Sequence, residues 1–314
     1  MRFGVAINSS FVAGESLEAR GQQLRRMAMA AEALGYESIW VPDRTVFPED
    51  IAARYPQFGS VGQIPDSQQV LEPLTSMSFL AGSTGTIKLG FNVVILPFRN
   101  PVLNAKMIAT LDVLSGGRVI FGVGVGWMPE EFEAMDASWE DRGTVTDEHI
   151  EMFKVLCADG VAEYQGKHFQ TSGKIFYPKP LQRPHPPIWV GGKSRIALRR
   201  VARLGQGWLP IGNTPAEIAT GGKYLREQCE VLGRDPDTVE LGLNISPTFG
   251  EPQTSSEGEH IPLTGSVEQV REDVRRYRDA GLDFMLLSTT RIDAGPAIEA
   301  LRRFAQEVAP EFSE

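Results

Sequence analysis

Apolar runs of strand length alternate with helical patterns along the whole 314-residue chain. The strand-like runs occupy residues 3–7, 38–41, 87–96, 119–123, 188–190, 207–211, 239–245 and 284–287. The helical patterns occupy residues 16–34, 72–81, 101–114, 144–158, 194–204, 215–232, 267–280 and 296–308. Short apolar strands joined by helices form parallel sheets that are buried on both faces. This alternation favours an α/β fold, a (β/α)8 barrel with loop insertions, over a doubly wound sheet, which usually needs fewer units or a second domain.

The predicted helix boundaries carry their own chemical signals. Asn100 and Pro101 combine an N-cap with proline at the first helical position. Residues 214–217 and 266–269 have the pattern of capping boxes. Gly35, Gly205, Gly233 and Gly281 each follow the end of a helical pattern. No linker rich in serine and glycine divides the chain, so we expect one domain over residues 1–314.

Composition excludes several classes of protein. The formal net charge of −9 argues against a nucleic-acid-binding protein, because neutralising phosphates needs a basic face. No apolar run has the length of a membrane span, and the N-terminus lacks the apolar core of a signal peptide, so we expect a cytoplasmic protein. Cys157 and Cys229 lie in helical patterns and are expected to be reduced structural thiols. The scattered histidines form no HExxH or Cys/His cluster, so no metal site is expected.

Three connections between predicted elements are long. Residues 44–71 follow the second strand and contain aromatic side chains. In a plain surface insertion these side chains would be exposed to solvent, so we expect a lid over the barrel mouth. Residues 247–265 follow the seventh strand and open from the same face. Residues 159–187 are also rich in aromatic side chains and prolines. A plain insertion is the alternative for each of them.

Two glycine-rich segments follow strand-like runs. Trp127 stands where the dinucleotide fingerprint needs a glycine, so the run at residues 122–126 suggests instead a close approach of backbone, either to a flat ligand or to the neighbouring chain segment. Gly191, Gly192, Lys193 and Ser194 follow the fifth strand and open a helix. Pro187 stands where a P-loop needs its first glycine, which excludes that motif. A helix N-terminus beside a lysine still attracts phosphate, and a glycine turn with a solvated lysine is the alternative.

Charged side chains end the second and third strands. Asp43 and Arg44 would project into the barrel mouth, where barrel strands deliver reactive groups, unless they form a salt bridge between neighbouring loops. Arg99 either reaches the pocket or pairs with a carboxylate on the rim. Asp112 and Arg118 lie at a helix end and at the bottom of the barrel, where we expect structural roles.

Five segments, taken in order, resemble the bacterial luciferase-like family, and most closely its branch of F420-dependent oxidoreductases, which use a reduced deazaflavin coenzyme. These segments are Ser38–Asp43, Leu96–Pro101, Ala109–Arg118, Phe121–Phe132 and Pro187–Gly192. The resemblance covers almost the whole chain and is weakest over residues 44–71 and after Pro247. Relatives use FMN in the same pocket, so the motifs specify the family more closely than the cofactor.

The resemblance implies a barrel that holds an isoalloxazine-like ring at the carboxyl ends of its strands. It implies that Asp43 contacts the ring edge, and that Asn92 and Val93, joined by a non-proline cis peptide bond, lie behind the ring. Gly124 is counted with these cofactor-binding residues because of its predicted close approach. The resemblance also places Gly191, Gly192, Lys193 and Ser194 around the cofactor phosphate. It implies a homodimer as well.

Two positions depart from the family pattern. Arg44 stands where the family often has histidine, and Trp127 stands where some deazaflavin dehydrogenases carry a catalytic glutamate. Arginine cannot donate a proton near neutral pH, because its pKa exceeds about 12, but it can hold an anionic substrate or stabilise an anionic ring. Glu130 and Glu131 lie near the mouth and are expected to be helix-start residues. We assign catalytic roles to Asp43 and Arg44, and the proton donor stays open.

Three hypotheses follow for function. The first is an oxidoreductase that uses coenzyme F420 for hydride transfer to or from a small organic substrate. The second is a monooxygenase that uses reduced FMN supplied by a separate reductase. The third is a cofactor-binding protein without turnover. The intact predicted lid and phosphate loop favour an enzyme over the third, and the sequence does not identify the substrate.

Overall fold

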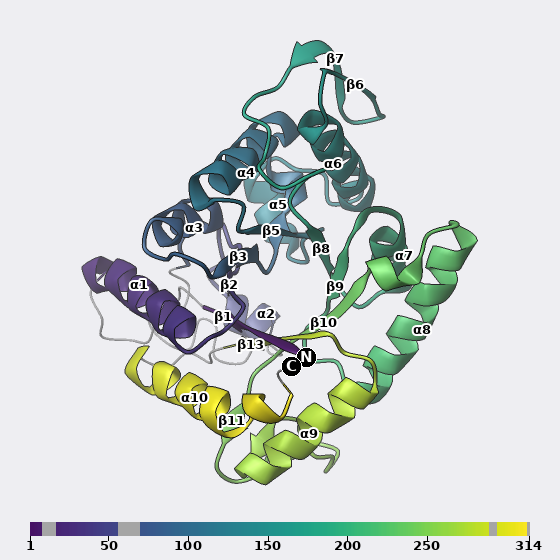
Figure 1. The fold of residues 1–314 in the computed structure, drawn as a ribbon. Coiled ribbons are helices and arrows are strands. Elements are labelled where there is room, and N and C mark those ends of the chain that lie inside the picture. Colours follow the sequence, from purple (N-terminus) through teal and green to yellow (C-terminus); the bar gives the residue numbers. More distant parts are fainter. Residues whose placement is uncertain (8–16, 56–69, 289–293, 313–314) are drawn as a thin grey trace.

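The computed structural model describes residues 1–314 apart from 8–16, 56–69, 289–293 and 313–314. Eight parallel strands close into a barrel, which confirms the predicted α/β barrel fold (Figure 1). They are β1 (Arg2–Ala6), β2 (Ser38–Val41), β3 (Lys88–Phe91), β5 (Val119–Gly124), β8 (Ile188–Gly191), β9 (Gly207–Leu209), β10 (Glu240–Ile245) and β13 (Phe284–Ser288). Around the ring the order is β3-β2-β1-β13-β10-β9-β8-β5, and the pairing of β3 with β5 closes the sheet. The short strand β4 (Val94–Ile95) follows β3 and also pairs with β5.

Helices surround the strands on the outside of the barrel (Figure 1). They are α1 (Leu17–Ala33), α3 (Pro73–Ala81), α4 (Pro101–Ser115), α6 (Arg142–Cys157), α7 (Arg195–Leu204), α8 (Pro215–Val231), α9 (Val267–Asp279) and α10 (Ala294–Glu307). Two shorter helices, α2 (Ile51–Arg54) and α5 (Pro129–Ala134), follow β2 and β5. Within the described ranges, every helix is too short or too polar to cross a bilayer.

The capping signals in the sequence are used as predicted. The Asn100 side chain accepts hydrogen bonds from the backbone N–H groups of Val102 and Leu103 at the start of α4. Both predicted capping boxes are complete, Thr214 with Glu217 on α8 and Ser266 with Gln269 on α9. These caps satisfy backbone donors that a helix leaves free at its N-terminus. They explain why the helix starts could be predicted to within about two residues.

Large aromatic rings fill the interior of the barrel. Trp40, Trp189 and Phe284 form a buried cluster in which the centroids of the two indoles lie 5.7 Å apart. Glycines on neighbouring strands make room for these rings. A Cβ at Gly90 would lie 2.2 Å from the Trp40 ring, and a Cβ at Gly207 would lie 2.3 Å from the Trp189 ring. The barrel is therefore a packed core at this level and not an open channel.

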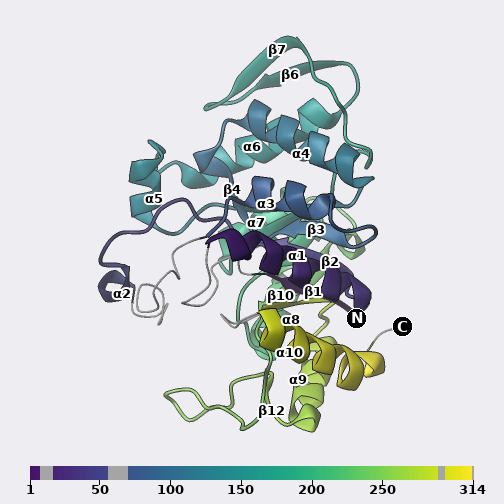
Figure 2. The ribbon, with the colours of Figure 1, turned by 90° about the vertical axis from the view of Figure 1, so that its left-hand side faces the viewer.

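The connection over residues 159–187 contains a structure that the sequence did not reveal. Strands β6 (Val161–Gln165) and β7 (Gln170–Ile175) form an antiparallel hairpin that projects beyond α4 and α6 (Figure 2). The Glu148 side chain on α6 accepts backbone N–H groups of Lys167, His168 and Phe169 at the hairpin turn. Most of the β7 residues are exposed, so the alternation of buried and exposed residues that marks a strand is missing.

Asp112 and Arg118 have the structural roles that we predicted. The Asp112 carboxylate is buried and accepts hydrogen bonds from the backbone and the side chain of Gln182. The Arg118 guanidinium donates to the backbone carbonyls of Ala81 and Ile87, each at 2.9 Å. These contacts tie the ends of helices and loops together before β3 and β5, away from the barrel mouth.

Candidate active site

The carboxyl ends of the parallel strands meet at one end of the barrel, which we call the mouth. Helices α2 and α5 lie at the mouth, whereas the N-terminus lies at the opposite end (Figure 2). The lid predicted over residues 44–71 is described only at 44–55 and 70–71, so most of it lies outside the described residues. In (β/α)8 barrels the mouth is the face that carries binding and catalysis.

Asp43 lies directly after β2 and is held in a buried ion pair. Its carboxylate accepts two hydrogen bonds from the Arg99 guanidinium, at 2.6 and 3.1 Å, and a third from the backbone N–H of Ile95 at 2.8 Å. Arg99 also reaches Glu72 at 3.3 Å and the carbonyl of Ile95. Of the two alternatives for Arg99, the structure shows the pairing on the rim. The pair fixes the end of β2 against β4.

Arg44 is held by a different carboxylate. Its Nη1 donates to Glu131 Oε2 at 2.6 Å, and the other oxygen of Glu131 accepts the backbone N–H of Thr45 at 2.9 Å. The Glu131 side chain is completely buried. Burial raises the pKa of this carboxyl, while the adjacent Arg44 guanidinium acts in the opposite direction. Asp43 and Arg44 therefore both form the inter-loop salt bridges that were the alternative to free side chains in the mouth.

The two positions that depart from the family pattern lie in contact with each other. The Arg44 guanidinium carbon lies 4.4 Å from the ring centroid of Trp127, within the range of a cation–π interaction. The Tyr55 ring meets the same indole edge-on, with centroids 5.1 Å apart, and its hydroxyl donates to Glu130 at 2.9 Å. Arg54 at the end of α2 also pairs with Glu130 at 2.9 Å. Contacts of both α2 and β2 with the start of α5 thus build one wall of the mouth.

Glu131 was not identified from the sequence as the partner of Arg44, and the start of α5 explains why. Pro129 occupies the first position of α5, and Glu130 and Glu131 lie in its first turn, as helix-start residues should. Met128 and Phe132, three residues before and one residue after Glu131, are both buried. Residues three positions apart share one helix face, whereas adjacent residues do not, so it is the burial of Met128 that points to an inward Glu131. The sequence therefore held a signal that Glu131 faces inward, but it gave no sign that Arg44 is its partner.

The predicted cofactor-backing residues lie on one continuous surface. Asn92 and Val93 are joined by a non-proline cis peptide bond, as the family resemblance implied. A Cβ at Gly124 on β5 would lie 2.4 Å from Val93 Cγ2, and a Cβ at Gly191 on β8 would lie 3.1 Å from Val93 Cγ1. The side chain of Val93 therefore fills the space beside Gly124, which is a close approach to a neighbouring chain segment.

The glycine turn after β8 leads into α7. Gly192 has a φ of +106°, and its carbonyl accepts the indole N–H of Trp208 at 2.7 Å. Ser194 is the N-cap of α7, and its hydroxyl accepts the backbone N–H of Ala197 at 3.2 Å. Gly192, Lys193 and Ser194 are all exposed, so the N-terminus of α7 is open to a ligand. This geometry suits an anion at the helix N-terminus.

The remaining titratable residues of the sequence analysis lie elsewhere. Cys157 and Cys229 are both free and buried, and burial raises the pKa of both thiols. In the part of the chain that the structure describes, no three acidic, histidine or cysteine side chains lie together as metal ligands would. His149 is buried between α4 and α6, where it contacts the side-chain amide of Asn104 at 3.1 Å.

Sequence comparison identifies the family. A family model described as luciferase-like monooxygenase matches residues 1–264. The chain belongs to this family. An uncharacterised protein of Mycobacterium tuberculosis is 34% identical over 193 residues, which cover 61% of this chain and 66% of that protein, slightly less than two thirds of its length. A second uncharacterised protein of the same organism is 30% identical over 233 residues, 73% of this chain and 81% of that protein.

Several solved structures share the fold across the whole chain. The monooxygenase RslO1 from Streptomyces bottropensis has a TM-score of 0.83 at 20% identity, with 100% of both chains covered. The coenzyme F420-dependent tetrahydromethanopterin reductase from Methanopyrus kandleri has a TM-score of 0.79 at 18% identity and 99% coverage of both chains. An F420-dependent secondary alcohol dehydrogenase has a TM-score of 0.79 at 16% identity, with 100% of this chain and 99% of that chain covered.

Proposed function

We propose that this luciferase-like protein is an oxidoreductase that uses coenzyme F420 for hydride transfer to or from a small organic substrate. The observation that carries the proposal is the contact of Val93 with both Gly124 and Gly191. This contact supports the proposal, because Val93 lies directly beside Gly191, where the glycine turn that opens α7 begins. Family membership and the similarity to two F420-dependent enzymes support the choice of cofactor.

The described residues fit such a cofactor. A side chain at Gly192 would need a φ of +106°, which favours glycine, and would come within 3.2 Å of Ala197. The turn therefore has no side chain at position 192 in front of the N-terminus of α7, and Lys193 adds a positive charge there. In the proposal Gly191, Gly192, Lys193 and Ser194 hold the phosphate, while Asp43, Asn92, Val93 and Gly124 adjoin the ring. When bound, the deazaflavin supplies the hydride position at its C5 atom.

A second candidate is a monooxygenase that uses reduced FMN from a separate reductase. Two observations favour it: the similarity to the monooxygenase RslO1, and the pairing of Arg44 with Trp127 at the mouth. Neither of these two side chains donates a proton at neutral pH. A reaction that needs a proton from the protein at this place therefore cannot take it from Arg44 or Trp127.

Anaerobic titration with reduced F420 and with reduced FMN tests the proposal. We expect F420 to bind in the micromolar range or tighter and FMN to bind at least 10-fold more weakly. Lys193→Gln should weaken F420 binding several-fold, since it removes one charge near the phosphate, while Lys223→Gln on α8 serves as the matched control. Micromolar affinity for FMN with none for F420, together with substrate-dependent oxygen consumption, would establish the second candidate instead.

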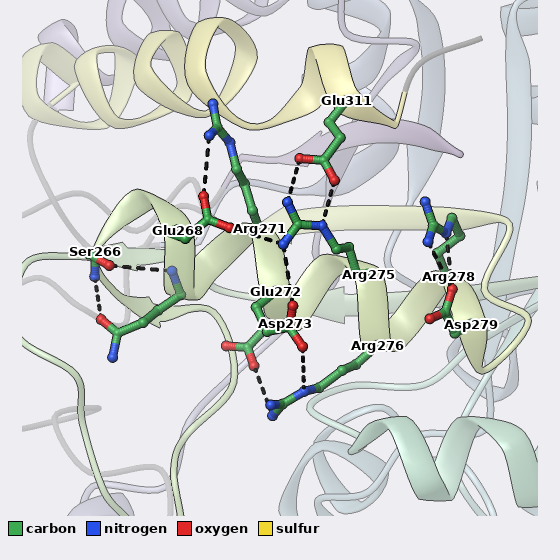
Figure 3. A network of polar contacts seen from close by, with 11 residues as sticks. Ser266, Glu268, Arg271, Glu272, Asp273, Arg275, Arg276, Arg278, Asp279 and Glu311 are labelled. Atoms are coloured by element: carbon green, nitrogen blue, oxygen red, sulfur yellow. Dashed lines mark hydrogen bonds and ion pairs between the residues drawn. The ribbon is translucent and has the colours of Figure 1, made fainter.

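We propose further that the protein is a cytoplasmic homodimer. Helices α3 and α4 pack side by side and contain two charged residues between them, Lys106 and the buried Asp112. Apolar side chains of these two helices are exposed at Phe79, Val102, Leu103, Met107, Val113 and Leu114. Helix α9, by contrast, carries a network of arginines and carboxylates (Figure 3). A helix that is apolar all round is normally covered on its outer side as well.

A further inference from the structure

We propose that Arg44 is a substrate-binding residue that selects an oxyanion, a carboxylate or a similar planar group, on the substrate. Glu131 and Trp127 are the residues that position its guanidinium. The inference rests on the proposed function only in taking the barrel mouth as the place where a small organic substrate binds. It holds for either candidate cofactor.

The position of Arg44 follows from the strand order. It lies after the end of β2, while Trp127 lies after the end of β5, and both strands pair with β3. The two side chains therefore bracket the strand that continues into Asn92 and Val93, the predicted backing of the cofactor ring. In the proposal, a group bound by Arg44 lies at the mouth beside the end of that strand.

Arg44 keeps hydrogen-bonding capacity that Arg99 has lost. Arg99 donates to both oxygens of Asp43, to a backbone carbonyl and to Glu72. Among the described residues, Arg44 donates one hydrogen bond, to Glu131. A guanidinium has five N–H donors, so most of those on Arg44 remain for a ligand. Its side chain is 18% exposed, so part of it stays accessible.

Glu131 and Trp127 fix the guanidinium without closing it off. The Glu131 carboxylate is fully buried and uses one oxygen for Arg44 and the other for Thr45, so it cannot meet a substrate itself. The indole of Trp127 lies against the guanidinium at 4.4 Å. An arginine held in this way loses little further freedom when it binds. A planar guanidinium in a partly desolvated site matches a carboxylate with two parallel hydrogen bonds.

Paired probes test the inference without knowledge of the substrate. Acetate, benzoate, phenylacetate and cinnamate are titrated by ligand-observed NMR, each beside its neutral amide. We expect at least one carboxylate to bind the wild-type protein about 10-fold more tightly than its amide, which corresponds to about 1.4 kcal/mol. If no carboxylate is preferred over its amide, the inference is wrong.

Three variants assign the preference to Arg44. Arg44→Gln should abolish the preference for the carboxylate. Arg44→Gln alone leaves Glu131 buried without its partner. The double variant R44Q/E131Q removes both charges together, so it should fold and should also show no preference for the carboxylate. Arg54 is an exposed arginine at the same mouth, so the control variant Arg54→Gln should keep the preference for the carboxylate. A preference that survives in R44Q/E131Q would overturn the inference.

Cofactor titration of the same variants separates this inference from the proposed function. We expect R44Q/E131Q to bind reduced F420 or FMN within about threefold of the wild type, because the proposed phosphate turn is untouched. If the affinity for the reduced cofactor falls 10-fold or more while the carboxylate preference survives, Arg44 serves the anionic ring and the inference is wrong. If the wild type binds neither cofactor yet prefers carboxylates, the proposed function fails and this inference stands.

Discussion

At the scale of single residues, the mouth is organised by two ion pairs, each between a buried carboxylate and a partly exposed arginine. Asp43 and Arg99 share two hydrogen bonds, and Arg44 and Glu131 share one. In both pairs the carboxylate is almost completely buried while the arginine keeps some access to solvent. A buried carboxylate is costly without its partner, so each pair ties two loops together more strongly than an exposed pair can. The charges thereby fix the ends of β2, β4 and β5 relative to one another.

Asp43→Asn should destabilise the protein substantially. Asparagine keeps an oxygen for the backbone N–H of Ile95 but removes the charge that holds Arg99, so we expect a loss of about 3 kcal/mol in the free energy of unfolding. Urea denaturation measures this loss. Glu72→Gln is the matched control, because Glu72 meets the same guanidinium from an exposed position and should cost less than about 1 kcal/mol. Equal losses of stability in the two variants would contradict the conclusion that the buried pair of Asp43 and Arg99 stabilises the protein more than the exposed contact with Glu72.

His149 should make stability depend on pH. Burial lowers the pKa of this histidine from 6.5 to about 3 in the folded protein. Below pH 6.5 the unfolded chain takes up a proton that the folded protein does not, so stability falls as the pH falls from 6.5 toward 3. One such group contributes about 1.4 kcal/mol per pH unit within this window.

Urea denaturation at pH 7, 6 and 5 checks the contribution of His149. His149→Gln keeps an acceptor for the Asn104 amide, and it should lose less stability than the wild type between pH 6 and pH 5. Comparison at equal pH cancels the contribution of the carboxylates. Parallel pH profiles for the two proteins would show that His149 does not carry this dependence.

At the scale of elements, the sequence predicted the repeating strands and helices of the barrel. It missed the structures that depend on contacts with residues far away in the sequence. All eight barrel strands follow from short apolar runs, and the helix starts follow from local caps such as Asn100. The β6–β7 hairpin could not be predicted, because its strands are largely exposed and are held by Glu148 of a preceding helix. The pairing of Arg44 with Glu131 joins residues 87 positions apart. Local patterns contain no information about such a partner.

Close packing between strands gives a prediction about Gly122 of β5. A Cβ at this position would lie 1.7 Å from the backbone oxygen of Phe91, so the strands must separate to admit it. We expect Gly122→Ala to lose at least 4 kcal/mol or to fail to fold. Gly21→Ala in α1 is the control, because nothing lies within 4 Å of the new methyl group, and it should stabilise the protein by about 0.5–1 kcal/mol. Circular dichroism and urea denaturation distinguish these outcomes, and a native-like Gly122→Ala would contradict the barrel register.

At the scale of the whole molecule, the proposed dimer needs more surface than α3 and α4 provide. Two helices of 9 and 15 residues present a face of roughly 350 Å², less than half of the about 800 Å² that each partner buries in a standard interface. The segment after β7 lies beside α4, because Lys106 contacts the carbonyl of Tyr177 and Leu181 lies next to Gly117. Ile175, Tyr177 and Leu181 are all exposed. The β6–β7 excursion therefore extends the apolar face of α4 toward the required size.

Charges placed on this face should separate the dimer. Leu103 and Leu114 are 60% and 73% exposed on α4, so L103E/L114E should leave the fold intact while burying two carboxylates per subunit at the proposed interface. Light scattering after size exclusion should give twice the 34.5 kDa chain mass for the wild type and a single chain mass for the variant. Val231→Glu, which is 80% exposed on α8, should remain dimeric. Tyr177→Glu should weaken the dimer as well, because the helices alone are too small. A monomeric wild type, or a dimer that tolerates both leucine substitutions, would show that this face has another use.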